Sequence, residues 1–91
     1  MRTFSRTSQF KKDVKRAQKR GKDLAKLKAV LDRLIEGEQL SPECKDHPLR
    51  GNFVGSRDCH IELDWILIYT LIENDTHVRF ERTGTHSDLF R

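Results

Sequence analysis

The sequence predicts an α+β fold in which an antiparallel helical hairpin is followed by an antiparallel β-meander. Apolar residues recur at helical spacing in the first 37 residues and at every second position after residue 57, and a loop-like segment separates the two regions. The length of 91 residues suits one domain spanning residues 1–91. This length excludes a multidomain enzyme, a Rossmann domain with its cofactor and a barrel.

The first helix is expected to begin near Ser8 and to end at Gly21. Ser8 can cap its start, and Gly21 can adopt the left-handed conformation that stops a helix. The residues before it, 2–5, can form a short strand. The apolar positions that recur at helical spacing among lysines and arginines are Phe10, Val14 and Ala17.

A second helix is expected between Asp23, which can cap its start, and Gly37, which can end it. Two helices joined by a few residues form an antiparallel hairpin, and we expect both basic faces of this hairpin to turn outward. The apolar face of the second helix carries Leu24, Leu27, Leu31 and Leu34.

Residues 38–52 lack periodicity and contain both prolines, which predicts a loop. Polar and apolar residues alternate in the first and third strands that follow, whereas the second is almost continuously apolar and is expected to be buried on both faces. Asn74 and Asp75 predict a turn, but the turn near Asp64 contains no Gly or Pro. The expected strands are residues 58–63, 65–72 and 77–81.

The net charge of +4 is unevenly distributed, since residues 1–40 carry +7 and residues 41–91 carry −3. A basic half favours a polyanionic partner, although a solvated helical face is an equally open interpretation. The chain starts without a charged-then-apolar leader, and its longest apolar stretch is too short to cross a bilayer. Cys44 and Cys59 have no CxxC spacing. We therefore expect a cytoplasmic protein with free thiols and no membrane association.

The second half also carries the residues suited to chemistry: His47, His60, His77 and His86. Their spacing lacks the close ligand pairs of zinc sites, so we expect neither a metal nor another cofactor. Histidine titrates near neutral pH, so one copy can accept a proton while another donates one. Metal-independent RNA cleavage needs such a pair together with a cation that stabilises the charge developing on phosphorus.

Three further residues suit that reaction. Arg82 can grip a phosphate, Asp64 can orient a histidine, and Phe90 can stack on a splayed base. Each also has a purely structural interpretation. Arg82 can pair with Glu81 or Asp88, Phe90 can belong to the core, and a surface histidine can have no role.

Most of the chain resembles the YafQ branch of the RelE/ParE toxin superfamily, with the matching segments in the same order. A basic run near Lys22 takes part in the likeness, and the Arg-Thr-Gly-Thr-His run near the end is its most specific part. The other segments that carry the resemblance are Lys45–Leu49, Arg57–His60, Asp64–Tyr69 and Phe80–His86.

The resemblance implies the toxin of a type II toxin–antitoxin system, a ribosome-dependent and metal-independent endoribonuclease that cuts mRNA in the ribosomal A site. The family fold places a helical hairpin against a twisted antiparallel sheet, with the active site on the concave face. The implied partners are the ribosome, mRNA and a cognate antitoxin. Such an antitoxin is a small dimeric DNA-binding protein, and it connects the toxin to operator DNA.

By the same resemblance, His86 is expected to be the general acid and Arg82 the phosphate clamp. Either His47 or His60 then acts as the base, and Asp64 tunes the group beside it. The residues expected to be catalytic are therefore His47, His60, Asp64, Arg82 and His86.

Phe90 and Trp65 are the expected substrate-binding residues, although the apolar neighbours of Trp65 favour a packing role equally, and His77 matches no family site. Two alternatives stay open: a ParE-like toxin of the same fold that inhibits gyrase, and an RNA-binding module without catalysis. The basic residues expected to bind ribosomal RNA are Lys11, Lys12, Lys15, Arg16, Lys19, Arg20, Lys22, Lys26 and Lys28.

Overall fold

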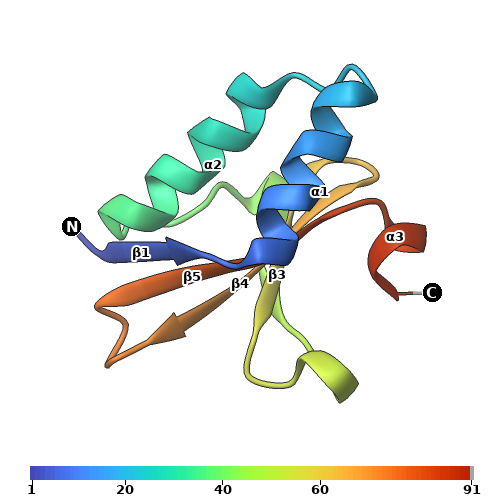
Figure 1. The fold of residues 1–91 in the computed structure, drawn as a ribbon. Helices are drawn as coiled ribbons and strands as arrows, with labels where there is room; N and C mark the ends of the chain where they lie inside the picture. The colour runs from blue at the N-terminus through green and yellow to red at the C-terminus, as the bar shows by residue number, and fades with distance from the viewer. Residues whose placement is uncertain (91) are drawn as a thin grey trace.

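A five-stranded sheet in the order β1-β5-β4-β3-β2 forms the centre of the computed structural model, which describes residues 1–90. The helices α1 and α2 lie over one face of this sheet, and the short helix α3 follows β5 near the C-terminus (Figure 1). The predicted α+β class is confirmed. The elements are β1 (Thr3–Arg6), α1 (Ser8–Lys19), α2 (Leu24–Glu36), the 3₁₀ turn η1 (Pro42–Cys44), β2 (His47–Pro48), the 3₁₀ turn η2 (Gly51–Phe53), β3 (Arg57–Glu62), β4 (Trp65–Ile72), β5 (His77–Gly84) and α3 (His86–Phe90).

The ends of the two long helices follow local signals. Gly21 and Gly37 adopt the expected left-handed conformation, and the Asp23 carboxylate accepts a hydrogen bond from a backbone N–H in the first turn of α2. The N-cap of α1 differs from the prediction. Thr7, not Ser8, accepts the hydrogen bond from the Phe10 N–H (2.9 Å), because Thr7 still has the extended backbone of the preceding strand.

Strand β1 makes the sheet mixed, because it pairs with β5 in parallel while the other neighbouring strands are antiparallel. A strand of four residues contains no local signal for its pairing direction. Its last residue, Arg6, lies opposite Phe80. Residues 81–84 of β5 therefore have no neighbouring strand on that edge.

The connection between β3 and β4 is a tight turn of Leu63 and Asp64, with an irregularity in the pairing between His60 and Glu62. Leu63 is 87% exposed in this turn, so its expected place on a buried strand face is wrong. The predicted loop, residues 38–52, contains the short elements η1, β2 and the start of η2.

The sheet is buried on both faces, which explains the continuous apolar run of β4. The larger core, between the sheet and the helical hairpin, includes Phe10, Leu27, Leu34, Trp65 and Leu67. The smaller core, on the opposite face, consists of Ile66, Ile68 and Leu89, with Leu49 and Phe53 packed against it. Within residues 1–90, no helix has the length and apolar character needed to cross a membrane.

Candidate active site

The strand register brings several of the expected residues onto the sheet face of the smaller core. Asp58 lies opposite Ile68 and Ile68 opposite Arg82, while His60 lies opposite Ile66. Residues paired across antiparallel strands point to the same face. One row of side chains therefore runs from Asp58 through Ile68 to Arg82 on the face that the helical hairpin leaves uncovered. A second row runs from His60 to Ile66 and ends at Gly84, which has no side chain.

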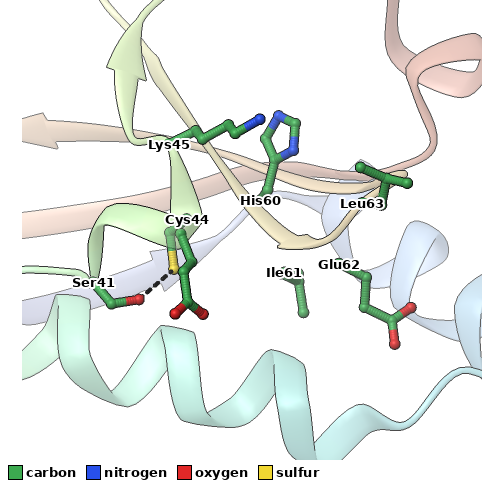
Figure 2. Close-up of a pocket in the computed structure, with 8 residues that line it drawn as sticks. Ser41, Cys44, Lys45, His60, Ile61, Glu62 and Leu63 are labelled. Carbon is green, nitrogen blue, oxygen red and sulfur yellow. Dashed lines mark hydrogen bonds between the residues drawn. The ribbon is translucent and has the colours of Figure 1, made fainter.

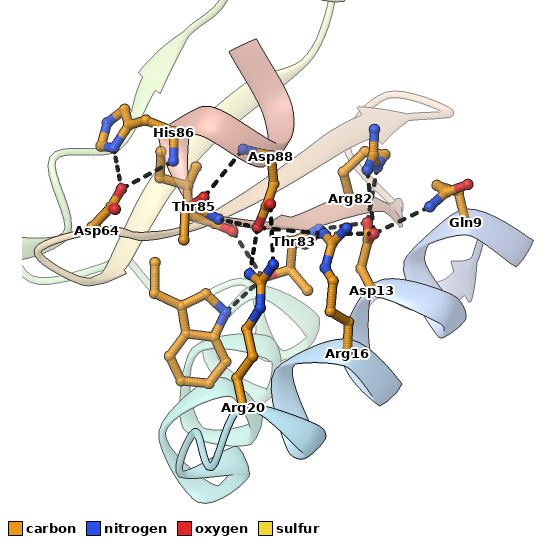
Figure 3. Close-up of polar contacts among 12 residues, drawn as sticks. Gln9, Asp13, Arg16, Arg20, Asp64, Arg82, Thr83, Thr85, His86 and Asp88 are labelled. Carbon is orange, nitrogen blue, oxygen red and sulfur yellow. Dashed lines mark hydrogen bonds and ion pairs between the residues drawn. The ribbon is translucent and has the colours of Figure 1, made fainter. Parts of the chain in front are cut away.

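His86 and Asp64 form the shortest polar contact of this site (Figure 3). His86 begins α3 and Asp64 lies in the β3–β4 turn; the ring Nδ1 is 2.6 Å from Asp64 Oδ1, and the backbone N–H donates to the same oxygen at 3.0 Å. Together these two hydrogen bonds hold the pKa of Asp64 below its ordinary value. The carboxylate fixes the ring so that Nε2 is left for chemistry.

Aromatic side chains surround His86. The His60 ring lies edge-on to it with centroids 5.5 Å apart, and the Phe90 ring lies 6.3 Å away. Phe90 also contacts Phe53 but remains 41% exposed, so one side of its ring can meet a base. The rings of His60 and Phe90 thus both lie close to the His86 ring.

His47 lies on β2 and its side chain is 52% exposed. Its Nδ1 is 2.7 Å from the carbonyl oxygen of Lys45. A carbonyl can only accept, so Nδ1 carries the hydrogen and the neutral ring presents its lone pair at Nε2. The same nitrogen is 3.1 Å from Asp58 Oδ1, where the geometry does not make a hydrogen bond.

Asp58 lies among the candidate site residues, and our sequence reasoning missed it. It is 4% exposed, and within residues 1–90 its Oδ1 has no hydrogen-bond partner. Burial raises its pKa, while the neighbouring His47, His60 and His86 act in the opposite direction. Its position two residues before His60, on the same strand face, was a signal in the sequence.

Arg82 pairs with Asp13 of α1, and not with Glu81 or Asp88 as the structural interpretation suggested. Its Nε and Nη2 lie 2.8 and 3.2 Å from the two carboxylate oxygens (Figure 3). This ion pair raises the pKa of the guanidinium. Asp13, which is 1% exposed, also escaped the sequence reasoning.

Two further residues, Trp65 and His77, make contacts that favour a role in the fold. Trp65 is 1% exposed within the larger core, where its Nε1 donates to Thr83 Oγ1 at 2.9 Å. A substrate base cannot stack on a ring buried in this way, so the geometry favours the packing interpretation. His77 bonds through both ring nitrogens to the hydroxyls of Thr3 and Ser5, between β1 and β5.

The nine basic residues expected to bind ribosomal RNA divide into two groups. Five of them form ion pairs within the protein: Arg16, Arg20, Lys22, Lys26 and Lys28. The other four are exposed and make no ion pair with residues 1–90: Lys11, Lys12, Lys15 and Lys19. Only the second group offers its full charge to a partner.

A hollow of about 320 Å³ lies beside His60, between η1 and the β3–β4 turn (Figure 2). Figure 2 shows the Lys45 side chain directed towards His60, with Glu62 and Leu63 at the end of the hollow near the β3–β4 turn. Within residues 1–90, no group of three or more His, Cys, Asp or Glu side chains is arranged to hold a metal ion.

The family model for the bacterial toxin of the type II toxin-antitoxin system, YafQ, matches residues 2–91. The chain belongs to this YafQ toxin family, as the sequence resemblance indicated. The mRNA interferase toxin YafQ of Escherichia coli strain K12 is 52% identical over 90 residues, which cover 98% of this chain and 96% of that protein.

Solved structures agree with this assignment. The crystal structure of YafQ from E. coli strain BL21(DE3) superposes with a TM-score of 0.93 at 50% identity and covers 100% of both chains. YafQ in the crystal structure of the E. coli DinJ-YafQ toxin-antitoxin complex gives a TM-score of 0.90 at 52% identity, covering 99% of this chain and 98% of that chain.

Proposed function

We propose that this protein is an mRNA interferase, an endoribonuclease that acts as the toxin of a type II toxin–antitoxin pair. The 52% identity to an E. coli protein of that name, over nearly the full length, supports the activity. The observation that carries the chemistry is the gathering of His60 and His86 on the sheet face that also carries Arg82. With His47 or His60 as the base, these residues supply acid, base and cation without a metal cofactor.

The reaction begins when a base removes the proton of a ribose 2′-hydroxyl. The lone pair on Nε2 of His47 suits this step, since Nδ1 is already committed to a carbonyl oxygen; His60 is the other candidate. The 2′-oxygen then attacks the adjacent phosphorus, and Arg82 stabilises the extra negative charge. His86 protonates the departing 5′-oxygen, which leaves a 2′,3′-cyclic phosphate and a 5′-hydroxyl.

Asp64 prepares His86 for the acid role. A carboxylate at Nδ1 fixes the orientation of the ring and of the Nε2–H that is given up. Phe90 stacks on a base next to the scissile bond, as its half-exposed ring allows. Asp58 lies buried beside these histidines, where burial raises the pKa of its carboxyl and the histidines act in the opposite direction.

The openness of the site supports ribosome-dependent action. The side chains of His86 and Asp64 are 53% and 61% exposed, so the site is open to solvent and does not enclose a substrate. The ribosomal A site holds the messenger in our proposal, and the chain docks there and cuts. Because ribosomes are in the cytoplasm, the proposed dependence on them makes the cytoplasm the place where this protein acts.

A cognate antitoxin is the second proposed partner. The support is the E. coli relative, whose crystal structure is that of a DinJ-YafQ toxin-antitoxin complex. By the family resemblance, the antitoxin is a small dimeric protein that binds operator DNA and thereby brings the toxin to that DNA indirectly.

The test is His86→Ala in a single-turnover assay on ribosomes programmed with mRNA. Loss of the general acid should slow cleavage by about 10²–10⁴-fold and leave ribosome binding unchanged. His77→Ala is the matched control, because this histidine lies between β1 and β5 and should leave cleavage as in the wild type. Wild-type cleavage by His86→Ala would reject the proposed acid. Inhibition of gyrase without any RNA cuts would instead favour the ParE-like alternative.

A further inference from the structure

We infer that Asp13, on helix α1, is a positioning residue for Arg82, which it holds in the orientation that the phosphate requires. The inference rests on the proposed function, because it deepens the role given there to Arg82. Asp13 is buried, contacts no other proposed catalytic residue and comes from the helical hairpin, not from the sheet that carries Arg82.

The contact is a two-pronged ion pair. Arg82 Nε donates to Asp13 Oδ2 at 2.8 Å, and Nη2 donates to Oδ1 at 3.2 Å. A planar guanidinium held through two nitrogens cannot rotate without breaking both hydrogen bonds. Side-chain torsions of Arg82 that stay mobile in a solvated arginine are therefore restricted before any RNA arrives.

The position of Asp13 follows from the open edge of β5. Because β1 ends opposite Phe80, the N–H of Thr83 has no strand partner on that edge. Asp13 Oδ2 accepts this N–H at 3.2 Å, so the carboxylate is anchored to the backbone of the residue next to Arg82. The anchor fixes the carboxylate relative to the strand that carries the cation.

The remaining contacts of Asp13 complete a satisfied buried site. Its Oδ1 also accepts from Arg16 Nη2 at 3.1 Å and from Gln9 Nε2 at 3.2 Å. A buried carboxylate with five donors is held rigidly, and its charge is compensated without complete reliance on Arg82. It can therefore orient the arginine while Arg16 shares the neutralisation of its charge.

Arg82 keeps the capacity to bind phosphate. A guanidinium has five N–H donors, and only two of those of Arg82 are used on Asp13. The connected cluster of Arg16, Arg20, Arg82, Asp13 and Asp88 contains three guanidinium groups and two carboxylates, so it remains net positive. A phosphate oxygen thus meets a fixed, positively charged donor.

The experiment compares wild type with Asp13→Asn, a substitution of equal size that removes the charge, in single-turnover cleavage of ribosome-bound mRNA. A misplaced cation should lower the cleavage rate on the order of 10²-fold while ribosome binding stays unchanged. Asp32→Asn is the matched control, because its carboxylate pairs with Lys28 on the exposed side of α2. A folded Asp13→Asn variant with the wild-type rate would overturn the inference.

The Arg82→Ala background separates positioning from a general structural effect. If Asp13 acts through Arg82, Asp13→Asn should cause no further loss there. An equal loss in both backgrounds would overturn the inference and leave the role of Arg82 intact. An Arg82→Ala variant that cleaves like wild type would instead reject the proposed phosphate clamp, and the positioning role with it.

A measurement on the wild-type protein covers the case in which Asp13→Asn does not fold. The Nε–H of Arg82 should give a slowly exchanging ¹H–¹⁵N resonance with a high order parameter, unlike that of Arg50, which is exposed in the loop before η2. Equal mobility of the two arginine side chains would overturn the inference without any substitution.

Discussion

Ring-nitrogen contacts distinguish the four histidines from one another. His86 and His47 each bind the protein through Nδ1, which leaves Nε2 of each for chemistry. The His60 ring packs edge-on against the His86 ring. His77 uses both of its nitrogens in hydrogen bonds to hydroxyl groups, so it has no atom left for proton transfer. The residue type was visible in the sequence, but these contacts were not.

Trp65 offers a stability test at a single side chain. Trp65→Phe retains most of the apolar surface but removes the indole N–H that Thr83 Oγ1 accepts in the core. We expect the free energy of unfolding to fall by about 1–2 kcal/mol, as measured by urea denaturation at pH 7. An unchanged midpoint would show that the buried hydrogen bond contributes nothing.

At the scale of secondary structure, helix α1 connects β5, which carries Arg82, with α3, which carries His86. Besides its apolar stripe, it reaches β5 through Asp13 and reaches α3 through Arg16 and Arg20, both of which pair with Asp88. The fit between β5 and α3 is close, since a Cβ added at Gly84 would lie 2.9 Å from the Asp88 Cβ. The helix that begins with His86 is therefore held by contacts from the hairpin.

The docking of α3 should depend on pH through Asp88. The hydrogen bond from Arg20, followed by that from the Thr85 N–H, holds the pKa of Asp88 far below its ordinary 3.8. The ionised carboxylate is thus favoured in the folded state, so its stabilisation is complete above about pH 4 and is lost as the pH falls further.

Asp88→Asn is accordingly expected to lower the free energy of unfolding by about 1 kcal/mol at pH 7, given the exposure of Arg20. The difference from wild type should narrow as the pH falls from 4 towards 2, because the wild type then also loses the charge. Thermal denaturation at pH 7, 4, 3 and 2 measures this. A difference in stability between wild type and Asp88→Asn that stays constant from pH 7 to pH 2 would contradict a stabilising role for the ionised Asp88 carboxylate.

The whole molecule has an uneven charge of +7 in residues 1–40 and −3 in residues 41–91. Internal ion pairs use part of the basic half, which reduces the surface available for nucleic acid. The exposed lysines of α1 remain, on the side of the protein that faces away from the sheet. The expected RNA-binding surface thus becomes smaller than the count of basic residues suggested.

Salt dependence of ribosome binding tests this smaller surface. Replacing Lys11, Lys12, Lys15 and Lys19 together with Gln should reduce the slope of log K against log salt by about 3, since each phosphate contact contributes about 0.7–0.9. The charge-neutral control is Lys28→Gln with Asp32→Asn, which removes an internal pair. An unchanged slope in the four-lysine variant would mean that ribosomal RNA is bound elsewhere.

The sequence by itself determined the two long helices, the three long strands and the histidine and arginine candidates of the site, but not β2 or α3. Helix ends at Gly21 and Gly37 and the apolar run of β4 depend on local conformational preference and on alternation along the chain, which neighbouring residues encode. Together with the family resemblance, the chemistry of histidine and arginine was sufficient to select candidates for catalysis.

Only the tertiary structure decided how these residues work together. Asp13 and Arg82 are 69 positions apart, and Asp64 and His86 are 22 apart, so no local pattern connects the members of either pair. The parallel pairing of β1 is a similar case, because it leaves open the edge of β5 that Asp13 caps. Long-range contacts of this kind arise only when the hairpin packs on the sheet, and they give the candidate residues their geometry.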